Sequence, residues 1–75
     1  MDLKKLIGNR ITNLRKEKGL SQQKLSIDAG LERSHLTNIE NGNKNISLST
    51  LEKIFTALDT SPSDFFNAEE FSKNK

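Results

Sequence analysis

The sequence predicts an all-α fold of five short helices, and three observations support this prediction. Apolar residues recur three or four positions apart along most of the 75-residue chain, which is the spacing that places them on one face of a helix. Serine or aspartate precedes most of these stretches, as residues that cap helix N-termini do. No stretch alternates apolar and polar residues as a half-buried strand would.

The first helix is expected between Asp2, which can cap its N-terminus, and Gly19, which can end it with a positive φ. Basic residues occupy its last turn, where positive charge favours the helix dipole. The apolar residues with helical spacing in this segment are Leu3, Leu6, Ile7, Ile11 and Leu14. This stripe is expected to face the core.

A helix-turn-helix unit is expected to follow between Gln22 and Asn41, as two short helices joined by a tight turn. Ser21 can cap the first of these helices. Gly30 ends it where a positive φ is commonly required and a side chain would be strained. The second helix of such a unit can enter the major groove of DNA, so it is the predicted recognition helix.

The spacing within this unit meets the steric needs of two helices that cross steeply. Counted from Gln22, the fifth residue is the small Ser26 at the crossing, and the ninth is Gly30 in the turn. The fifteenth and eighteenth residues, Leu36 and Ile39, supply apolar anchors behind the exposed face of the recognition helix. The alternative to a DNA-binding unit is an ordinary helical hairpin in a small bundle.

Two more helices are expected after a polar turn at residues 41–45. Ser47 can cap the fourth helix, and residues 61–64 read as an N-cap, a proline at the first helical position and an acid at the third for the fifth helix. The fourth helix has an apolar stripe of Leu48, Leu51, Ile54, Phe55 and Leu58, and the fifth carries Phe65 and Phe66.

Seventy-five residues make one domain that is too small to enclose a roomy substrate cavity. We expect a DNA-binding domain over residues 1–67 and a polar tail over residues 68–75, part of which Phe71 could hold down. The chain has no cysteine, no apolar run long enough to span a membrane and no signal-peptide pattern. A soluble cytoplasmic protein without a membrane partner is therefore expected.

The formal net charge is only +2, but the charges are unevenly distributed. Residues 1–45 contain nine Lys and Arg against five Asp and Glu, and residues 46–75 contain three against five. A basic part that carries the helix-turn-helix and an acidic part behind it suit a DNA face and a face turned away from DNA. An asymmetry of this size does not decide the function alone.

The sequence contains no catalytic or metal-binding constellation. His35 is the only histidine, and without cysteine or a second histidine it is a poor metal ligand. No serine or acid is arranged with it as an activated nucleophile requires. We expect no enzyme activity, no cofactor and no small-molecule ligand.

The outer face of the recognition helix carries polar residues suited to contact base edges. Arg33 can bond two acceptors of guanine at once, and Asn38 can pair with the edge of adenine. Ser34 and Thr37 can bond bases less selectively. The alternative is that these side chains are merely solvated.

A second set of polar residues is placed to contact the DNA backbone, which positions the protein without reading sequence. Gln22 begins the first helix of the unit, where free backbone N–H groups can also meet a phosphate. The other candidates are Gln23, His35, Asn41, Asn43 and Lys44. For any single asparagine, a plain solvated turn is the alternative.

These segments resemble the Cro- and lambda-repressor-like helix-turn-helix family over roughly residues 6–67. The stretches that carry the resemblance are residues 14–22, Ala29-Gly30-Leu31, Ile39-Glu40-Asn41-Gly42, Leu48 through Leu58, and Phe65-Phe66. Within this family the chain looks most like the controller proteins of restriction–modification systems. That narrower resemblance rests on residues 32–36, 45–48 and 57–59 ahead of the paired phenylalanines.

The resemblance implies a homodimer on a roughly palindromic double-stranded DNA operator, with one recognition helix in each half-site. It also implies a structural ion pair between Arg15 and Glu40, since the family commonly pairs Arg with Glu at these positions. The chain departs from the family pattern at two positions. Glu32 stands where Ser or Thr usually caps the recognition helix, and Ile27 is apolar where the pattern puts an outward-facing residue.

Pro62 and Phe66 are the candidates for the dimer interface. The core is expected to absorb the other large apolar residues of the C-terminal part, namely Leu48, Leu51, Phe55, Leu58 and Phe65. An exposed aromatic side chain beside a proline can form a self-complementary patch. The alternative, which the sequence leaves open, is that Phe66 completes the core of the monomer.

Two function classes remain. The first is a sequence-specific transcription regulator, with control of a restriction–modification operon as the narrower reading. The second is an antitoxin or another protein-interaction module of the same fold. An antitoxin commonly needs an added segment to wrap its partner, and only residues 68–75 are left over here, which favours the regulator.

Overall fold

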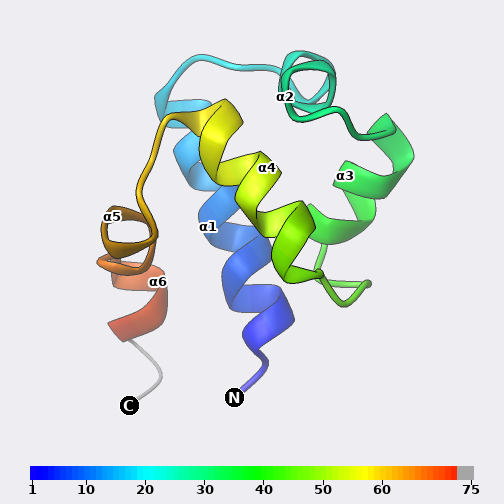
Figure 1. Ribbon diagram of the computed structural model, residues 1–75. Coiled ribbons are helices and arrows are strands. Elements are labelled where there is room, and N and C mark those ends of the chain that lie inside the picture. Colours follow the sequence, from blue (N-terminus) through cyan, green and yellow to red (C-terminus); the bar gives the residue numbers. More distant parts are fainter. Residues whose placement is uncertain (73–75) are drawn as a thin grey trace.

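A computed structural model describes residues 1–72 and contains six α-helices in this part of the chain (Figure 1). The helices are α1 (Leu3–Glu17), α2 (Gln22–Ala29), α3 (Arg33–Glu40), α4 (Leu48–Leu58), α5 (Pro62–Phe66) and α6 (Glu69–Ser72). No strand occurs between residues 1 and 72. The predicted all-α fold with a helix-turn-helix is confirmed.

The five predicted helices are all present, and α6 is an additional short helix in the segment expected to be a polar tail. Phe71 packs this helix against the domain, with its ring centroid 6.0 Å from that of Phe65 and 5.0 Å from that of Phe66. Asn13 Nδ2 of α1 also donates a hydrogen bond to Glu70 Oε2 at 2.8 Å. Residues 73–75 of the expected tail lie outside the described residues.

The predicted capping residues begin and end the helices. The hydroxyl oxygens of Ser21, Ser47 and Ser61 accept hydrogen bonds from backbone N–H groups three residues later, at 3.0, 3.1 and 3.0 Å. Gly19 and Gly30 follow α1 and α2 with φ values of 72° and 68°, a conformation that strains any residue with a Cβ atom. Local sequence signals therefore set most of the helix boundaries.

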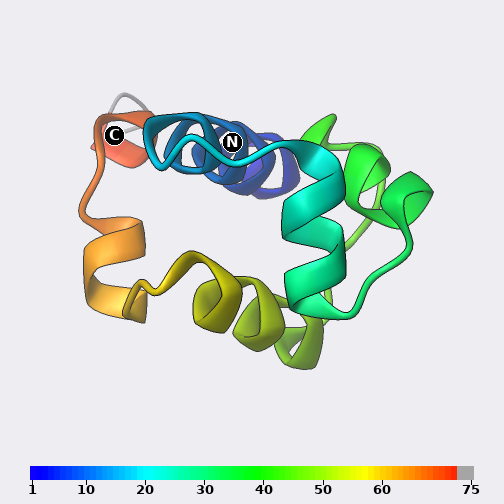
Figure 2. The same cartoon turned by 90° about the horizontal axis from the view of Figure 1, so that it is seen from above.

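The helices surround a single core (Figures 1 and 2). Seen from above, α1 and α4 form opposite sides of the molecule, α2 and α3 lie at one end, and α5 lies at the other. The buried apolar side chains between them are Ile7, Ile11, Leu14, Leu25, Ala29, Leu36, Ile39, Leu51, Ile54, Phe55, Leu58 and Phe65. All five helices predicted from the sequence contribute to this core.

Three residues of the predicted apolar stripes do not belong to the core, namely the half-buried Leu6 and the exposed Leu3 and Leu48. Leu48 is 81% exposed and Leu3 is 51% exposed. Each is the first residue of its helix. The expectation that the core absorbs Leu48 was therefore wrong, and the spacing alone could not reveal it.

Candidate nucleic-acid interface

The turn between α2 and α3 is built as the sequence predicts. Gly30 adopts the left-handed conformation, and the backbone N–H of Leu31 donates to the carbonyl oxygen of Ser26 at 2.8 Å. Ser26 is buried at the crossing, with 3% of its surface exposed, and Leu36 and Ile39 anchor α3 from behind. The inner face of α3 is thus fixed, and its outer face is turned away from the core.

The four predicted base-reading residues all lie on this helix, but they differ in exposure. Arg33 and Ser34 are exposed, whereas Thr37 and Asn38 are half-buried. The single proton of the Thr37 hydroxyl can be donated either to the carbonyl oxygen of Arg33 at 2.9 Å, one turn back along the helix, or to Gln22 Oε1 at 3.2 Å. Within residues 1–72 the guanidinium of Arg33 makes no hydrogen bond or ion pair, so it is available to a ligand on this face.

Glu32 forms the N-cap of α3 but makes no side-chain capping hydrogen bond. The backbone N–H groups at the start of α3 therefore have no partner from the side chain of residue 32. The other departure from the family pattern, Ile27, is 65% exposed and faces outward as predicted.

Five of the six predicted phosphate contacts are exposed around α2 and α3. They are Gln23, His35, Asn41, Asn43 and Lys44. Gln22 is different, because it is half-buried and its side chain already makes internal hydrogen bonds. Its Nε2 donates to Glu40 Oε1 at 3.0 Å, and its Oε1 can accept from the Thr37 hydroxyl at 3.2 Å.

Arg15 and Glu40 form a buried, two-pronged ion pair between α1 and α3. Arg15 Nε donates to Glu40 Oε2 at 2.8 Å, and Arg15 Nη2 donates to Glu40 Oε1 at 3.1 Å. Only 8% of Arg15 and 6% of Glu40 are exposed. The third guanidinium nitrogen, Nη1, donates to the carbonyl oxygen of Leu20 at 2.9 Å. Good geometry and added hydrogen bonds are the conditions under which a buried pair is tolerated.

Two further side chains join this pair and were not expected there. The Thr12 hydroxyl donates to Glu40 Oε1 at 3.1 Å, and the Gln22 amide donates to the same oxygen. Because Gln22 can also accept from Thr37, the network extends from the buried pair to the outer face of α3. The helical spacing that predicts a stripe identifies apolar faces only, so it did not point to these polar side chains.

Because Gly8 has no side chain, α1 can approach the C-terminal end of α3 more closely than it could with any other residue at this position. A Cβ atom at Gly8 would lie 2.5 Å from the carbonyl oxygen of Ile39 and 2.6 Å from that of Glu40. Just beyond α3, Gly42 has a φ of 73°, and a Cβ there would lie 2.9 Å from the Cα of Lys5. The C-terminal end of α3 is therefore seated directly on the backbone of α1.

Neither a metal site nor a membrane span is found in the described part of the chain. Among residues 1–72, no three His, Cys, Asp or Glu side chains are grouped closely enough to hold a metal ion. No helix in the same range is long and apolar enough to cross a membrane.

A recognition helix anchored from behind and carrying free polar groups in front defines a DNA-binding domain of the helix-turn-helix class. Residues 10–70 match the Cro/C1-type HTH DNA-binding domain, and the chain belongs to this family. It is 42% identical over 67 residues to the control protein C.MunI of Mycoplasma sp, a match that covers 88% of this chain and 90% of that one.

Solved structures of restriction–modification controller proteins have the same fold. C.AhdI from Aeromonas hydrophila is 39% identical with a TM-score of 0.83, covering 88% of this chain and 100% of that chain. C.Esp1396I is 29% identical with a TM-score of 0.91, covering 99% of each chain. C.Esp1396I is also known as a tetramer in complex with its natural 35-base-pair operator.

Proposed function

We propose that this protein is a sequence-specific transcription regulator that binds a roughly palindromic DNA operator as a homodimer. The observation that carries the proposal is the outer face of α3. There, Arg33 and Ser34 are exposed on a helix whose inner side is locked by Leu36 and Ile39. Family membership and the operator complex of C.Esp1396I support the same function.

Arg33, Ser34, Thr37 and Asn38 are assigned to base edges in the major groove. The exposed N-terminal end of α3 enters deepest in this mode of binding, which makes Arg33 the main reader. Gln23, His35, Asn41, Asn43 and Lys44 are assigned to the phosphates that flank the groove. The Gln22 amide has a second N–H beyond the one given to Glu40, and we assign that N–H to a phosphate.

The proposed dimer surface contains Pro62 and Phe66, which are both exposed, Phe66 by 41%. They line an open groove together with Leu51, Glu52, Phe55 and the first residue of α4, Leu48. Leu48 is 81% exposed, so the groove and its rim form an apolar surface that residues 1–72 leave uncovered. A second copy of the chain would cover it around a two-fold axis.

The regulated genes are proposed to be those of a restriction–modification system. Support comes from C.MunI, C.AhdI and C.Esp1396I, all of which are control proteins and match this chain over most of their length. We further propose that the protein acts in the cytoplasm, where the operator lies, and has no enzyme activity. The structural roles of the buried Arg15–Glu40 pair and of the capping residues Ser21 and Ser61 are consistent with this proposal.

Selection of bound duplexes from a random DNA pool, followed by footprinting, tests the function. We expect two copies of one half-site related by two-fold symmetry, with centres about 34–36 Å apart or a multiple of this distance. The same site should lie in the promoter of an endonuclease or methyltransferase gene of the source genome. Enrichment of a single asymmetric site, or of no site, would overturn the dimeric regulator, and a promoter elsewhere would overturn only the choice of genes.

A further inference from the structure

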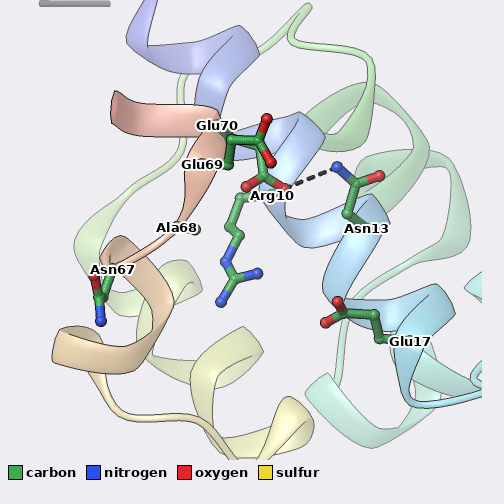
Figure 3. Close-up of a pocket in the computed structure, with 7 residues that line it drawn as sticks. All are labelled: Arg10, Asn13, Glu17, Asn67, Ala68, Glu69 and Glu70. Carbon is green, nitrogen blue, oxygen red and sulfur yellow. Dashed lines mark hydrogen bonds between the residues drawn. The ribbon is translucent and has the colours of Figure 1, made fainter. Parts of the chain in front are cut away.

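The inference concerns Arg10, a half-buried residue of α1 (Figure 3). Its side chain extends from α1 toward the segment that connects α5 with α6. Arg10 Nε donates to the carbonyl oxygen of Phe65 at 2.8 Å, and Arg10 Nη2 donates to that of Asp64 at 3.1 Å. The guanidinium carbon also lies 5.7 Å from the centroid of the Phe65 ring.

Helix α5 depends on such outside partners because it has only five residues, Pro62–Phe66. Its N-terminus is stabilised locally, by the Ser61 hydroxyl and by proline at the first position. Its C-terminal carbonyl groups have few partners within so short a helix. The N–H of Asn67 bonds the carbonyl of Ser63, and Arg10 bonds the next two carbonyls in the chain.

The contact is specific to an arginine. Two nitrogens of one planar fork meet two successive carbonyl oxygens, while the guanidinium carbon lies over the ring of Phe65. A lysine could supply the charge but only one of these hydrogen bonds in a fixed geometry. The positive charge also lies at the C-terminal end of α5, where the helix dipole favours it.

The orientation of α5 decides where Phe66 points. Phe65 is fully buried and packs 4.7 Å from the ring centroid of Phe55. Phe66, the next residue, stacks edge-on against Phe65 at 5.1 Å and reaches the surface. Neighbouring residues of an α-helix point about 100° apart, so a rotation of α5 would turn Phe66 away from its present direction and change the proposed dimer surface.

We propose that Arg10 is a positioning residue for the dimer surface: it fixes the C-terminal end of α5 so that Pro62 and Phe66 face a second copy of the chain. This inference rests on the proposed dimer. It assigns to α1 a role in assembly through contacts that are 54 and 55 residues apart in sequence.

The test compares Arg10→Ala and Arg10→Lys with Asn9→Ala, a change at the exposed neighbouring position of α1. Sedimentation equilibrium of each full-length chain gives the dimer dissociation constant, and circular dichroism gives the helix content. A duplex with a single half-site, titrated at concentrations where all chains are monomeric, reports on α2 and α3 alone.

Arg10→Ala should raise the dimer dissociation constant roughly 10-fold or more, since hydrogen bonds from a charged donor are removed. Arg10→Lys should give a smaller rise, and Asn9→Ala should match the wild type. Binding to the single half-site should stay within about twofold for all three variants, because no residue of the recognition surface changes. A side chain that merely supported the whole fold would lower both affinities together.

Wild-type dimerisation by both Arg10 variants would overturn the inference. So would an unfolded Arg10→Ala chain combined with an Arg10→Lys chain that dimerises normally, because Arg10 would then serve the fold alone. Phe66→Ala separates this failure from that of the proposed function. If Phe66→Ala still dimerises like the wild type, the dimer surface itself is misplaced, whatever the Arg10 variants do.

Discussion

The two ends of the molecule are held to α1 by different kinds of contact. At the helix-turn-helix end, α3 is fixed by the buried Arg15–Glu40 pair and by backbone contact at Gly8. At the other end, α5 and α6 are held by a cluster of phenylalanine rings and by hydrogen bonds from Arg10 and Asn13. The contacts that hold α3 to α1 are thus mainly polar and include close backbone packing. The contacts that hold α5 and α6 are mainly between aromatic rings, with hydrogen bonds at the edge of the cluster.

The comparison shows that α1 serves both ends with two different faces. Gly8, Thr12 and Arg15 recur at intervals of four and three, so they share the face that meets α3. Arg10 and Asn13 are three residues apart on another face, which meets α5 and α6. A rigid α1 therefore fixes the distance between the recognition helix and the proposed dimer surface, and in a dimer that distance sets the half-site spacing.

The largest effect is expected from breaking the polar end at Glu40. Glu40→Gln leaves the Arg15 guanidinium buried without a counter-charge, and this should lower the free energy of unfolding by about 3 kcal/mol or more. Urea denaturation followed by circular dichroism measures the change. Asp28→Asn is the matched control, because it removes the acid of the exposed Lys24–Asp28 pair and should cost below about 0.5 kcal/mol. Equal effects of the two changes would show that the buried pair does not hold α3.

A smaller effect is expected from Arg33, which acts on DNA and leaves the fold intact. Arg33→Ala should cost on the order of 1–3 kcal/mol on the selected operator and relax preference at one base pair per half-site. Arg33→Lys should keep the charge but forfeit part of the selectivity, since lysine lacks the planar fork. Titration against the operator and its single-base variants measures both quantities.

Lys53→Ala serves as the control for Arg33, because it removes an equal charge from an exposed position on α4. It should leave sequence preference unchanged. If Arg33→Ala instead weakens all DNA sequences equally, Arg33 contacts a phosphate. Reading of the sequence would then rest on Ser34, Thr37 and Asn38.

Local signals in the sequence predict most of the fold and the outline of the site. Ser21 and Ser61 cap helices because each hydroxyl accepts a hydrogen bond from the backbone N–H three residues later. This contact involves only neighbouring residues, so the sequence alone can predict it. Gly30 ends α2 for an equally local reason. The recognition helix could be located because its apolar anchors and its turn occur at fixed intervals.

What the sequence missed depends on contacts between segments far apart in the chain. No local pattern distinguishes Gly8 in α1, whose importance comes from the carbonyl groups of α3. Gln22 was predicted on the DNA backbone alone, and its bond to Glu40 becomes visible only when α2 and α3 are packed. Helix α6 is four residues long, and Phe71 holds it through rings contributed by α5. A helix of four residues is too short to show the repeating apolar spacing by which a helix is recognised in a sequence.

At the end of the molecule that contains α5 and α6, a change at Phe71 is expected to lower stability. Phe71→Ala removes a half-buried ring that contacts Phe65 and Phe66, so the free energy of unfolding should fall by about 1–2 kcal/mol, less than for a fully buried phenylalanine. Single half-site affinity of the folded chain should not change, because α2 and α3 keep their contacts. Weaker half-site binding at unchanged stability would contradict the separation between the two ends.

The smallest effect is expected at Lys44, which is exposed in the turn beyond α3. Its flexible point charge suits a phosphate better than a base edge, because it presents no planar pair of donors. Lys44→Ala should therefore weaken operator and unrelated DNA by the same factor. The slope of log affinity against log salt should become shallower by about one unit for each phosphate that the variant no longer neutralises.

Titrations at several salt concentrations measure the slope, with Lys53→Ala again as the charge-matched control that leaves it unchanged. A weakening confined to the operator would mean that Lys44 reads a base, and the recognition surface would then extend past the end of α3 into residues 41–45.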